Sequence, residues 1–145
     1  MEFPTDLTTE PIKGEELKGL KILVVDDIAD NQTLLSRRLQ RCGASVEIAE
    51  NGLEGVTMAL LKPYDLILMD LQMPIVDGLT ATKHLRKCGF DRPIVACTAQ
   101  AEERDNALNF FGFDDFFAKP LDLAALIHRL RRYQILNMLR NSTVS

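Results

Sequence analysis

The stretch that decides the fold of this chain is Leu66-Ile-Leu-Met69, which is followed directly by Asp70. An uninterrupted apolar run of this length is typical of a strand that is buried on both faces of a sheet. Three further runs of the same kind also end at polar residues: residues 22–25 before Asp26 and Asp27, 94–97 before Thr98, and 116–118 before Lys119. Because the carboxyl ends of parallel strands share one edge, we expect these polar side chains to converge there.

Segments with helical apolar spacing separate the runs, and residues 46–48 add a further strand in which apolar and polar residues alternate. Strands that alternate with helices call for a parallel sheet with right-handed crossovers and helices on both faces. The sequence therefore predicts an α/β fold of flavodoxin-like topology, with a five-stranded parallel sheet in the order 2-1-3-4-5. In that order the first and third strands are neighbours, which brings Asp26 and Asp27 toward Asp70.

The composition indicates one globular domain that needs no metal or disulfide to fold. The chain has 145 residues, 46% of them hydrophobic, and its three cysteines form no C-x-x-C pair. No apolar stretch reaches the ~20 residues that cross a bilayer, so we expect no membrane insertion and a cytoplasmic location. Residues 19–120 hold fifteen acids and eleven bases, a charge balance that argues against direct binding of nucleic acid.

The two ends of the chain differ from its middle. Residues 1–18 mix prolines, Gly14 and charges without an apolar period, so we expect a leader or linker that contributes little to the core. The main domain is expected over residues 19–133. Residues 134–145 are expected to be an extension of the last helix and a tail, and two alternatives stay open for them: an amphipathic helix that pairs with a partner or a second copy, or a frayed helix end.

The converging acids predict a metal site and a nucleophile. Carboxylates that crowd together repel one another unless a cation joins them, and an all-oxygen set of ligands suits Mg²⁺. If Asp70 attacks phosphorus, the product is an acyl phosphate, and the chemistry consists mainly of neutralising the phosphoryl oxygens. Lys119 supplies a positive charge and the hydroxyl of Thr98 a hydrogen bond. Each of these residues alone is commonly a turn former, a helix cap or a solvated lysine, so the joint pattern carries the hypothesis.

The two histidines do not fit the role of phosphate donor. His84 and His128 lie on amphipathic segments without a neighbouring acid to orient the ring, which is typical of surface or partly packed histidines. The donor histidine is expected on another protein or domain.

Residues 20–133 resemble the receiver domain of response regulators in two-component signalling, and the motif wording is closest to the receivers of hybrid sensor histidine kinases. The segments that carry the resemblance are Ile22-Leu-Val-Val-Asp-Asp27, Glu50-Asn-Gly52, Leu68-Met-Asp70-Leu-Gln-Met-Pro74 with Asp77-Gly78, Cys97-Thr-Ala99 and Phe117-Ala-Lys119-Pro120.

The resemblance implies a role for each matching residue. Asp70 is the expected phosphoacceptor, and the expected Mg²⁺ ligands are Asp26, Asp27, Asp70 and the backbone carbonyl of Gln72. Thr98 and Phe116 occupy the switch positions, through which phosphorylation remodels the surface formed by the fourth helix, fifth strand and fifth helix.

Further expectations follow from the same resemblance. Gln72 and Gln100 lie two residues beyond Asp70 and Thr98, which suggests that they tune the lifetime of the phosphate. The Lys119–Pro120 bond is expected to be cis. The expected partner is a histidine kinase or a histidine phosphotransfer domain. The domain is expected to catalyse only its own phosphorylation and dephosphorylation, so it is not an enzyme acting on other substrates.

Two other functions remain open at this point. A phosphatase of the haloacid-dehalogenase type also forms an aspartyl phosphate, but it usually carries a second Asp two residues after the nucleophile, where this chain has Gln72. The other alternative is an interaction module that keeps the fold and is never phosphorylated.

Overall fold

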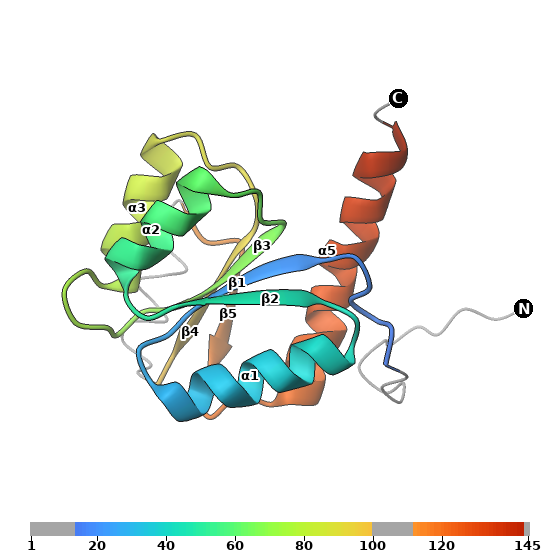
Figure 1. Cartoon of the computed structure of the whole chain (residues 1–145), viewed down its shortest axis with the longest axis horizontal. Coiled ribbons are helices and arrows are strands. Elements are labelled where there is room, and N and C mark those ends of the chain that lie inside the picture. The colour runs from blue at the N-terminus through green and yellow to red at the C-terminus, as the bar shows by residue number, and fades with distance from the viewer. Residues whose placement is uncertain (1–13, 100–111, 144–145) are drawn as a thin grey trace, which may run out of the picture.

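The computed structural model describes residues 14–99 and 112–143, and these form a central sheet with helices on both faces (Figure 1). The strands are β1 (Lys21–Val25), β2 (Ser45–Ala49), β3 (Leu66–Asp70), β4 (Ile94–Thr98) and β5 (Asp115–Ala118). The helices are α1 (Ala29–Arg41), α2 (Gly52–Leu61), α3 (Gly78–Lys87) and α5 (Leu123–Thr143). The helix expected between β4 and β5 lies outside the described residues.

The sheet is parallel throughout and has the predicted order β2-β1-β3-β4-β5. Its register places the carboxyl ends of β1, β3 and β4 side by side, because Val25 pairs with Met69 and Asp70 pairs with Cys97. β5 continues this edge, since Thr98 pairs with Ala118, the residue before Lys119. The expected fold class is confirmed.

Alternate residues of the strands feed two apolar cores, one on each face of the sheet. Ile22, Val24, Leu66 and Leu68 belong to the core that also contains residues of α1 and α5. Leu23, Val25, Ile67 and Met69 belong to the core shared with α2 and α3. Every residue of β3 and β4 is buried, which explains why these two strands read as uninterrupted apolar runs.

The loop between β3 and α3 is held against the sheet edge by a glycine. A Cβ atom added at Gly78 would lie 2.2 Å from the carbonyl oxygen of Asp70, so no larger residue fits without a shift of the backbone. The side chain of Asp77 caps α3 by accepting a hydrogen bond of 2.7 Å from the N–H of Thr80. The Asp77-Gly78 pair therefore fixes where the chain returns after Asp70.

The segment before β1 contributes more to the core than its sequence indicates. Leu17 is fully buried in the core beneath α1 and α5, and its N–H donates to the carbonyl of Cys42 at 2.8 Å. The expectation that residues 1–18 contribute little to the core is therefore wrong for this residue. Leu17 is flanked by Glu16 and Lys18, and a single apolar residue among charges gives no periodic signal.

The final helix is long and continuous. The side chain of Asp122 accepts a hydrogen bond from the N–H of Ala125 at its start, and α5 then runs for 21 residues to Thr143. His128 is buried within α5, whereas His84 on α3 is exposed. In the part of the chain that the structure describes, no helix combines the length and apolarity needed to cross a membrane.

Replacing Leu17 by Ala should lower the free energy of unfolding by about 2–5 kcal/mol, because the change removes a fully buried side chain and leaves a cavity. Leu61→Ala is the matched control, since Leu61 is 78% exposed, and this change should have little effect. Urea denaturation measures both. Equal, small effects of the two changes would show that Leu17 is not part of the core.

Candidate active site

Three side chains from three strand ends meet at the carboxyl edge of the sheet. The ammonium nitrogen Nζ of Lys119 lies 3.0 Å from Oδ2 of Asp70 and 3.4 Å from Oδ2 of Asp26. These residues are separated by 49 and 93 positions in the sequence, so only the order of the sheet brings them together. Asp26 and Asp70 are 2% and 5% exposed, which makes this a buried cluster of charge.

In both Asp26 and Asp70, one carboxylate oxygen bonds to the backbone and the other bonds to Lys119. Oδ1 of Asp26 accepts a hydrogen bond from the N–H of Ile28, and Oδ1 of Asp70 accepts one from the N–H of Gln72. Both donors lie two residues beyond the acid, which is the geometry of an Asx turn. The backbone thus holds one oxygen of each carboxylate and leaves Oδ2 directed at Lys119.

Asp27 completes a group of three acids. One carboxylate oxygen from each of Asp26, Asp27 and Asp70 lies within 4.8 Å of the others, and Asp27 is exposed to solvent. The donor set is all oxygen, and the one exposed member leaves room for water. This chemistry fits a hard divalent cation such as Mg²⁺, which keeps several waters when it binds carboxylates.

Burial and charge act in opposite directions on the two central groups. Burial raises the pKa of Asp70, and the hydrogen bonds from Lys119 and Gln72 offset this effect only in part. For Lys119, burial opposes the charged form, but the pairing with Asp70 and Asp26 outweighs it, so its pKa is raised. Lys119 is therefore a stable cation, while ionised Asp70 is held at a cost in free energy.

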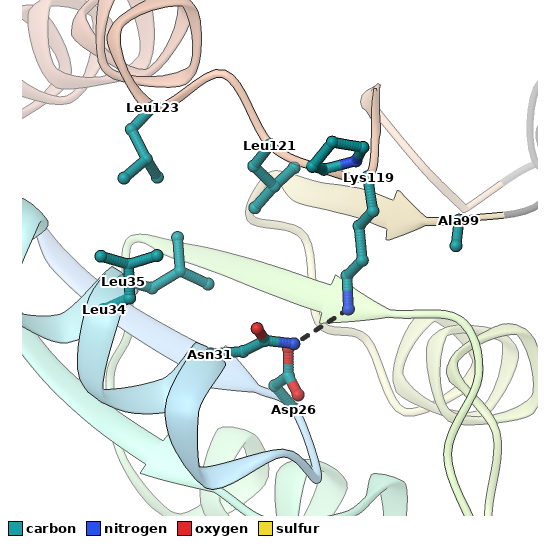
Figure 2. A pocket seen from close by; sticks show the side chains of 9 residues that line it. Asp26, Asn31, Leu34, Leu35, Ala99, Lys119, Leu121 and Leu123 are labelled. Atoms are coloured by element: carbon teal, nitrogen blue, oxygen red, sulfur yellow. Dashed lines mark hydrogen bonds and ion pairs between the residues drawn. The ribbon is translucent and has the colours of Figure 1, made fainter.

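An apolar cavity of about 400 Å³ opens next to this cluster, between α1 and the loop that joins β5 to α5. Figure 2 shows Lys119 reaching down to Asp26 at one end of the cavity, with Leu34 and Leu35 of α1 facing Leu121 and Leu123. Asn31 lies close to the charged end. We call this cavity the α1 groove. The residues that define it are Asp26, Asn31, Leu34, Leu35, Lys119, Leu121 and Leu123.

No sequence pattern indicated the α1 groove, because its two walls come from distant segments. The one available signal is Asn31, a polar residue on the same helix face as Ile28 and Leu35, where an apolar residue would continue the pattern. Leu34 is 53% exposed although it belongs to the apolar spacing of α1.

A family model for the response regulator receiver domain matches residues 22–131, which is most of the chain. The chain belongs to the response regulator receiver family. It is therefore a receiver domain of two-component and phosphorelay signalling, a class of signalling module rather than of enzymes, and the haloacid-dehalogenase alternative is set aside.

Curated relatives include both free-standing and multidomain proteins. Two-component response regulator 24 of Arabidopsis thaliana is 40% identical over 134 residues, which cover 88% of this chain and 96% of that protein. Hybrid signal transduction histidine kinase G of Dictyostelium discoideum is 43% identical over 130 residues, 85% of this chain, but the match spans only 4% of that kinase.

Solved receiver domains have the same fold. The receiver of a Pseudomonas aeruginosa sensor histidine kinase, solved with a magnesium ion in its active-site cleft, is 37% identical with a TM-score of 0.73 and covers 80% of this chain and 98% of its own. The receiver of the Saccharomyces cerevisiae regulator Ssk1, solved in complex with the phosphotransfer protein Ypd1, is 28% identical with a TM-score of 0.75 and covers 83% and 92%.

Three of the remaining predicted residues of this receiver domain fall within the described part of the chain: Thr98, Phe116 and Gln72. Thr98 ends β4 and is 1% exposed, and its carbonyl accepts a hydrogen bond of 2.8 Å from the N–H of Lys119. Phe116 is half-buried and packs against the small cluster of Leu71 and Ala96. Gln72 is exposed beside Asp70. Gln100 lies outside the described residues.

The geometry adds two further details. The Lys119–Pro120 peptide bond is cis, as the resemblance implies. The thiol of Cys97 is buried next to the charged cluster, and burial raises its pKa to about 12, so it stays protonated at neutral pH.

The raised pKa of Asp70 predicts how its replacement changes stability with pH. Below the unfolded-state pKa of 3.8 the carboxyl is neutral in both states, so Asp70→Asn should change the free energy of unfolding least there. As the pH rises above 3.8, the unfolded chain ionises before the folded one does, and the wild type loses stability relative to the variant. The advantage of Asp70→Asn should therefore grow as the pH rises above about 4, and it should level off once Asp70 is ionised in the folded state as well.

Urea denaturation at several pH values from about 4 upward measures this difference. Asp30→Asn, which removes an exposed acid from the first turn of α1, is the control for general loss of negative charge. An advantage of Asp70→Asn that nowhere increases above about pH 4 would contradict the raised pKa of Asp70.

Proposed function

We propose that this receiver domain accepts a phosphoryl group on Asp70 from a phosphohistidine, which is carried by a histidine kinase or a histidine phosphotransfer domain. The observation that supports this proposal best is the pairing of Asp70 Oδ2 with Lys119 Nζ at 3.0 Å, beside two further carboxylates. A nucleophile next to a fixed cation and a metal-binding set of oxygens is what phosphoryl transfer requires.

In the proposed step, an oxygen of Asp70 forms a bond to phosphorus while the bond from phosphorus to the histidine nitrogen breaks. The electron pair of that bond leaves with the imidazole of the donor. Asp26, Asp27, Asp70 and the carbonyl of Gln72 would hold Mg²⁺, which supplies positive charge to the phosphoryl oxygens. The ionised form of Asp70 is the nucleophile, and its partial desolvation removes water that would otherwise have to be displaced.

Lys119 and Thr98 then respond to the new charge. Phosphorylation of Asp70 gives the ammonium group of Lys119 a phosphoryl oxygen to pair with, and Lys119 is already held at the site by Asp26 at 3.4 Å. The hydroxyl of Thr98 donates a hydrogen bond to another phosphoryl oxygen. Movement of Thr98 would allow the half-buried ring of Phe116 to change its packing, which would alter the β5–α5 surface.

The catalysis proposed here is confined to the domain's own phosphorylation and the loss of that phosphate by hydrolysis. We propose that Gln72 and Gln100 set the rate of this loss, because they follow Asp70 and Thr98 at equal distance in the sequence. Loss of phosphoryl label, followed in variants of both residues, tests this role, and unchanged decay rates would exclude it.

The α1 groove is the proposed docking site for the donor. It opens at Lys119 and Asp26 and offers Leu34, Leu121 and Leu123 to an apolar helix of the partner. The Ssk1 receiver, which was solved together with a phosphotransfer protein, supports a partner of this kind.

We place the reaction in the cytoplasm, since Cys42, Cys88 and Cys97 are all free thiols.

Incubation of the full chain with acetyl phosphate and Mg²⁺ should add one phosphoryl group, which intact-mass spectrometry detects and hydroxylamine removes. Asp70→Asn should abolish the adduct, and Lys119→Met should reduce its rate of formation by at least about tenfold, since one charge-assisted hydrogen bond contributes about 1.5–3 kcal/mol. Asp30→Asn should react like the wild type. An adduct that persists in Asp70→Asn would refute the proposed phosphoacceptor.

Binding of Mg²⁺ should raise the melting temperature, because a ligand that binds only the folded state stabilises it. At a concentration about ten times the dissociation constant, the gain is about 1.4 kcal/mol. Asp27→Asn should abolish most of this gain, since Asp27 is the exposed member of the acidic group. Differential scanning fluorimetry with and without Mg²⁺ makes the comparison, with Asp30→Asn as control. If Mg²⁺ raised the melting temperatures of Asp27→Asn and Asp30→Asn equally, the cation would bind at another site.

A further inference from the structure

The final helix changes character at Gln134. Before it, Leu126, Ile127 and Leu130 are fully buried, and the side-chain amide of Gln134 donates to the carbonyl of Lys18 at 3.0 Å. After it, four large apolar side chains are exposed by 38–60%: Ile135, Leu136, Met138 and Leu139. Figure 1 shows this end of α5 projecting beyond the sheet toward the C-terminus. Solvent-facing apolar residues in such number on one helix mark an interaction surface.

Three of these residues form a stripe along one side of the helix. Residues advance by about 100° around an α-helix, so Ile135, Met138 and Leu139 share a face, whereas Leu136 points about 100° away from Ile135. Arg131 and Ser142 continue the same face at its two ends. The positions 131, 135, 138 and 142 have the alternating spacing of four and three residues that two paired helices use. We call Arg131, Ile135, Met138 and Ser142 the α5 seam.

The charges of α5 decide how two copies of the seam can pair. The helix carries Arg129, Arg131, Arg132 and Arg140, and residues 123–143 contain no acid. In a parallel pair Arg131 would face Arg131 of the second copy, which is repulsive. In an antiparallel pair Ile135 faces Met138, and Arg131 faces the hydroxyl of Ser142. The antiparallel seam is thus complementary to itself and brings no arginine of the seam opposite another.

We propose that the end of α5 pairs with the same segment of a second copy of this chain in antiparallel orientation. Ile135 of each copy contacts Met138 of the other, and Leu139 covers the edge of the contact. The arrangement has two-fold symmetry and closes as a dimer. Because the rest of α5 is bound to its own sheet, the two domains lie at opposite ends of the paired helices and do not compete for the same space. This inference does not depend on phosphorylation of Asp70.

The length of the contact sets its strength. The overlap runs from residue 131 to residue 142, which is about 18 Å of helix. Two such short helices bury less than the roughly 1,200 Å² found in stable complexes, so the dimer is weak and forms at high protein concentration. Both helices are basic, so salt screens their mutual repulsion and should strengthen the dimer.

Sedimentation velocity of the full chain over a range of concentrations, at low and high salt, tests the proposal. The wild type should dimerise as concentration rises, and more readily at high salt. Ile135→Arg should abolish the dimer, because it places a charge in the seam. Leu136→Arg is the matched control: it adds the same charge one residue away, at an exposed position outside the seam, and should keep the dimer. Circular dichroism checks that both variants stay folded.

A third variant tests the orientation. Ser142→Glu places an acid opposite Arg131 in the antiparallel pair, and each new ion pair should tighten the dimer by about 1.4- to 5-fold. In a parallel pair the same change would set the introduced carboxylate against its own copy and weaken the dimer. Tighter association of this variant supports the proposal, and weaker association overturns it.

The other outcomes are also decisive. A chain that stays monomeric at all concentrations and both salt levels would overturn the inference, as would a dimer that survives Ile135→Arg. Binding of the basic helix to vesicles of anionic lipid without any self-association would assign the stripe to a membrane surface instead. Asp70→Asn should dimerise like the wild type, which separates this result from the outcome of the phosphorylation experiment.

Discussion

The site depends on one electrostatic arrangement: a lysine ammonium group held between two buried carboxylates at the edge of a parallel sheet. Asp26 and Asp70 are almost inaccessible to water, and charges in such a place are tolerated only when a counter-charge is close. Lys119 provides it, at 3.4 and 3.0 Å. The balance is incomplete, because Asp27 adds a third acid and the pKa of Asp70 stays raised. This excess of negative charge fits the binding of a divalent cation, which would in turn supply positive charge to a phosphoryl group.

The rest of the fold keeps this arrangement in place. The order of the sheet makes β1 and β3 neighbours, and the two Asx turns fix one oxygen of each buried acid. Gly78 lets the next loop pass against the carbonyl of Asp70, and the carbonyl of Thr98 accepts a hydrogen bond from the N–H of Lys119. Each contact uses the backbone, so the positions of the charged side chains follow from the topology.

The strand ends could be predicted from the sequence because buried parallel strands leave uninterrupted apolar runs, such as residues 66–69, with polar residues directly after them. The alternation of strands and helices then predicted a parallel sheet, for which the flavodoxin-like order was the favoured topology. Leu17 could not be predicted, since its burial depends on contact with distant residues such as Cys42 and its neighbours are charged. The α1 groove was missed for the same reason, because its walls come from residues 31–35 and 119–123. At residues 135–139, helical spacing was compatible with a continued helix and with a frayed end, and local sequence could not decide between them.

The central claim is that Asp70 and Lys119 are the two protein groups that meet the phosphoryl group. A crystal structure of the full chain with Mg²⁺ and beryllofluoride, a mimic of the phosphoryl group, tests it most directly. We expect beryllium bonded to an oxygen of Asp70, with Lys119 and Thr98 each contacting a different fluorine and Mg²⁺ held by Asp26 and Asp27. A beryllofluoride adduct at any other residue, or one at Asp70 with Lys119 turned away from it, would contradict the claim.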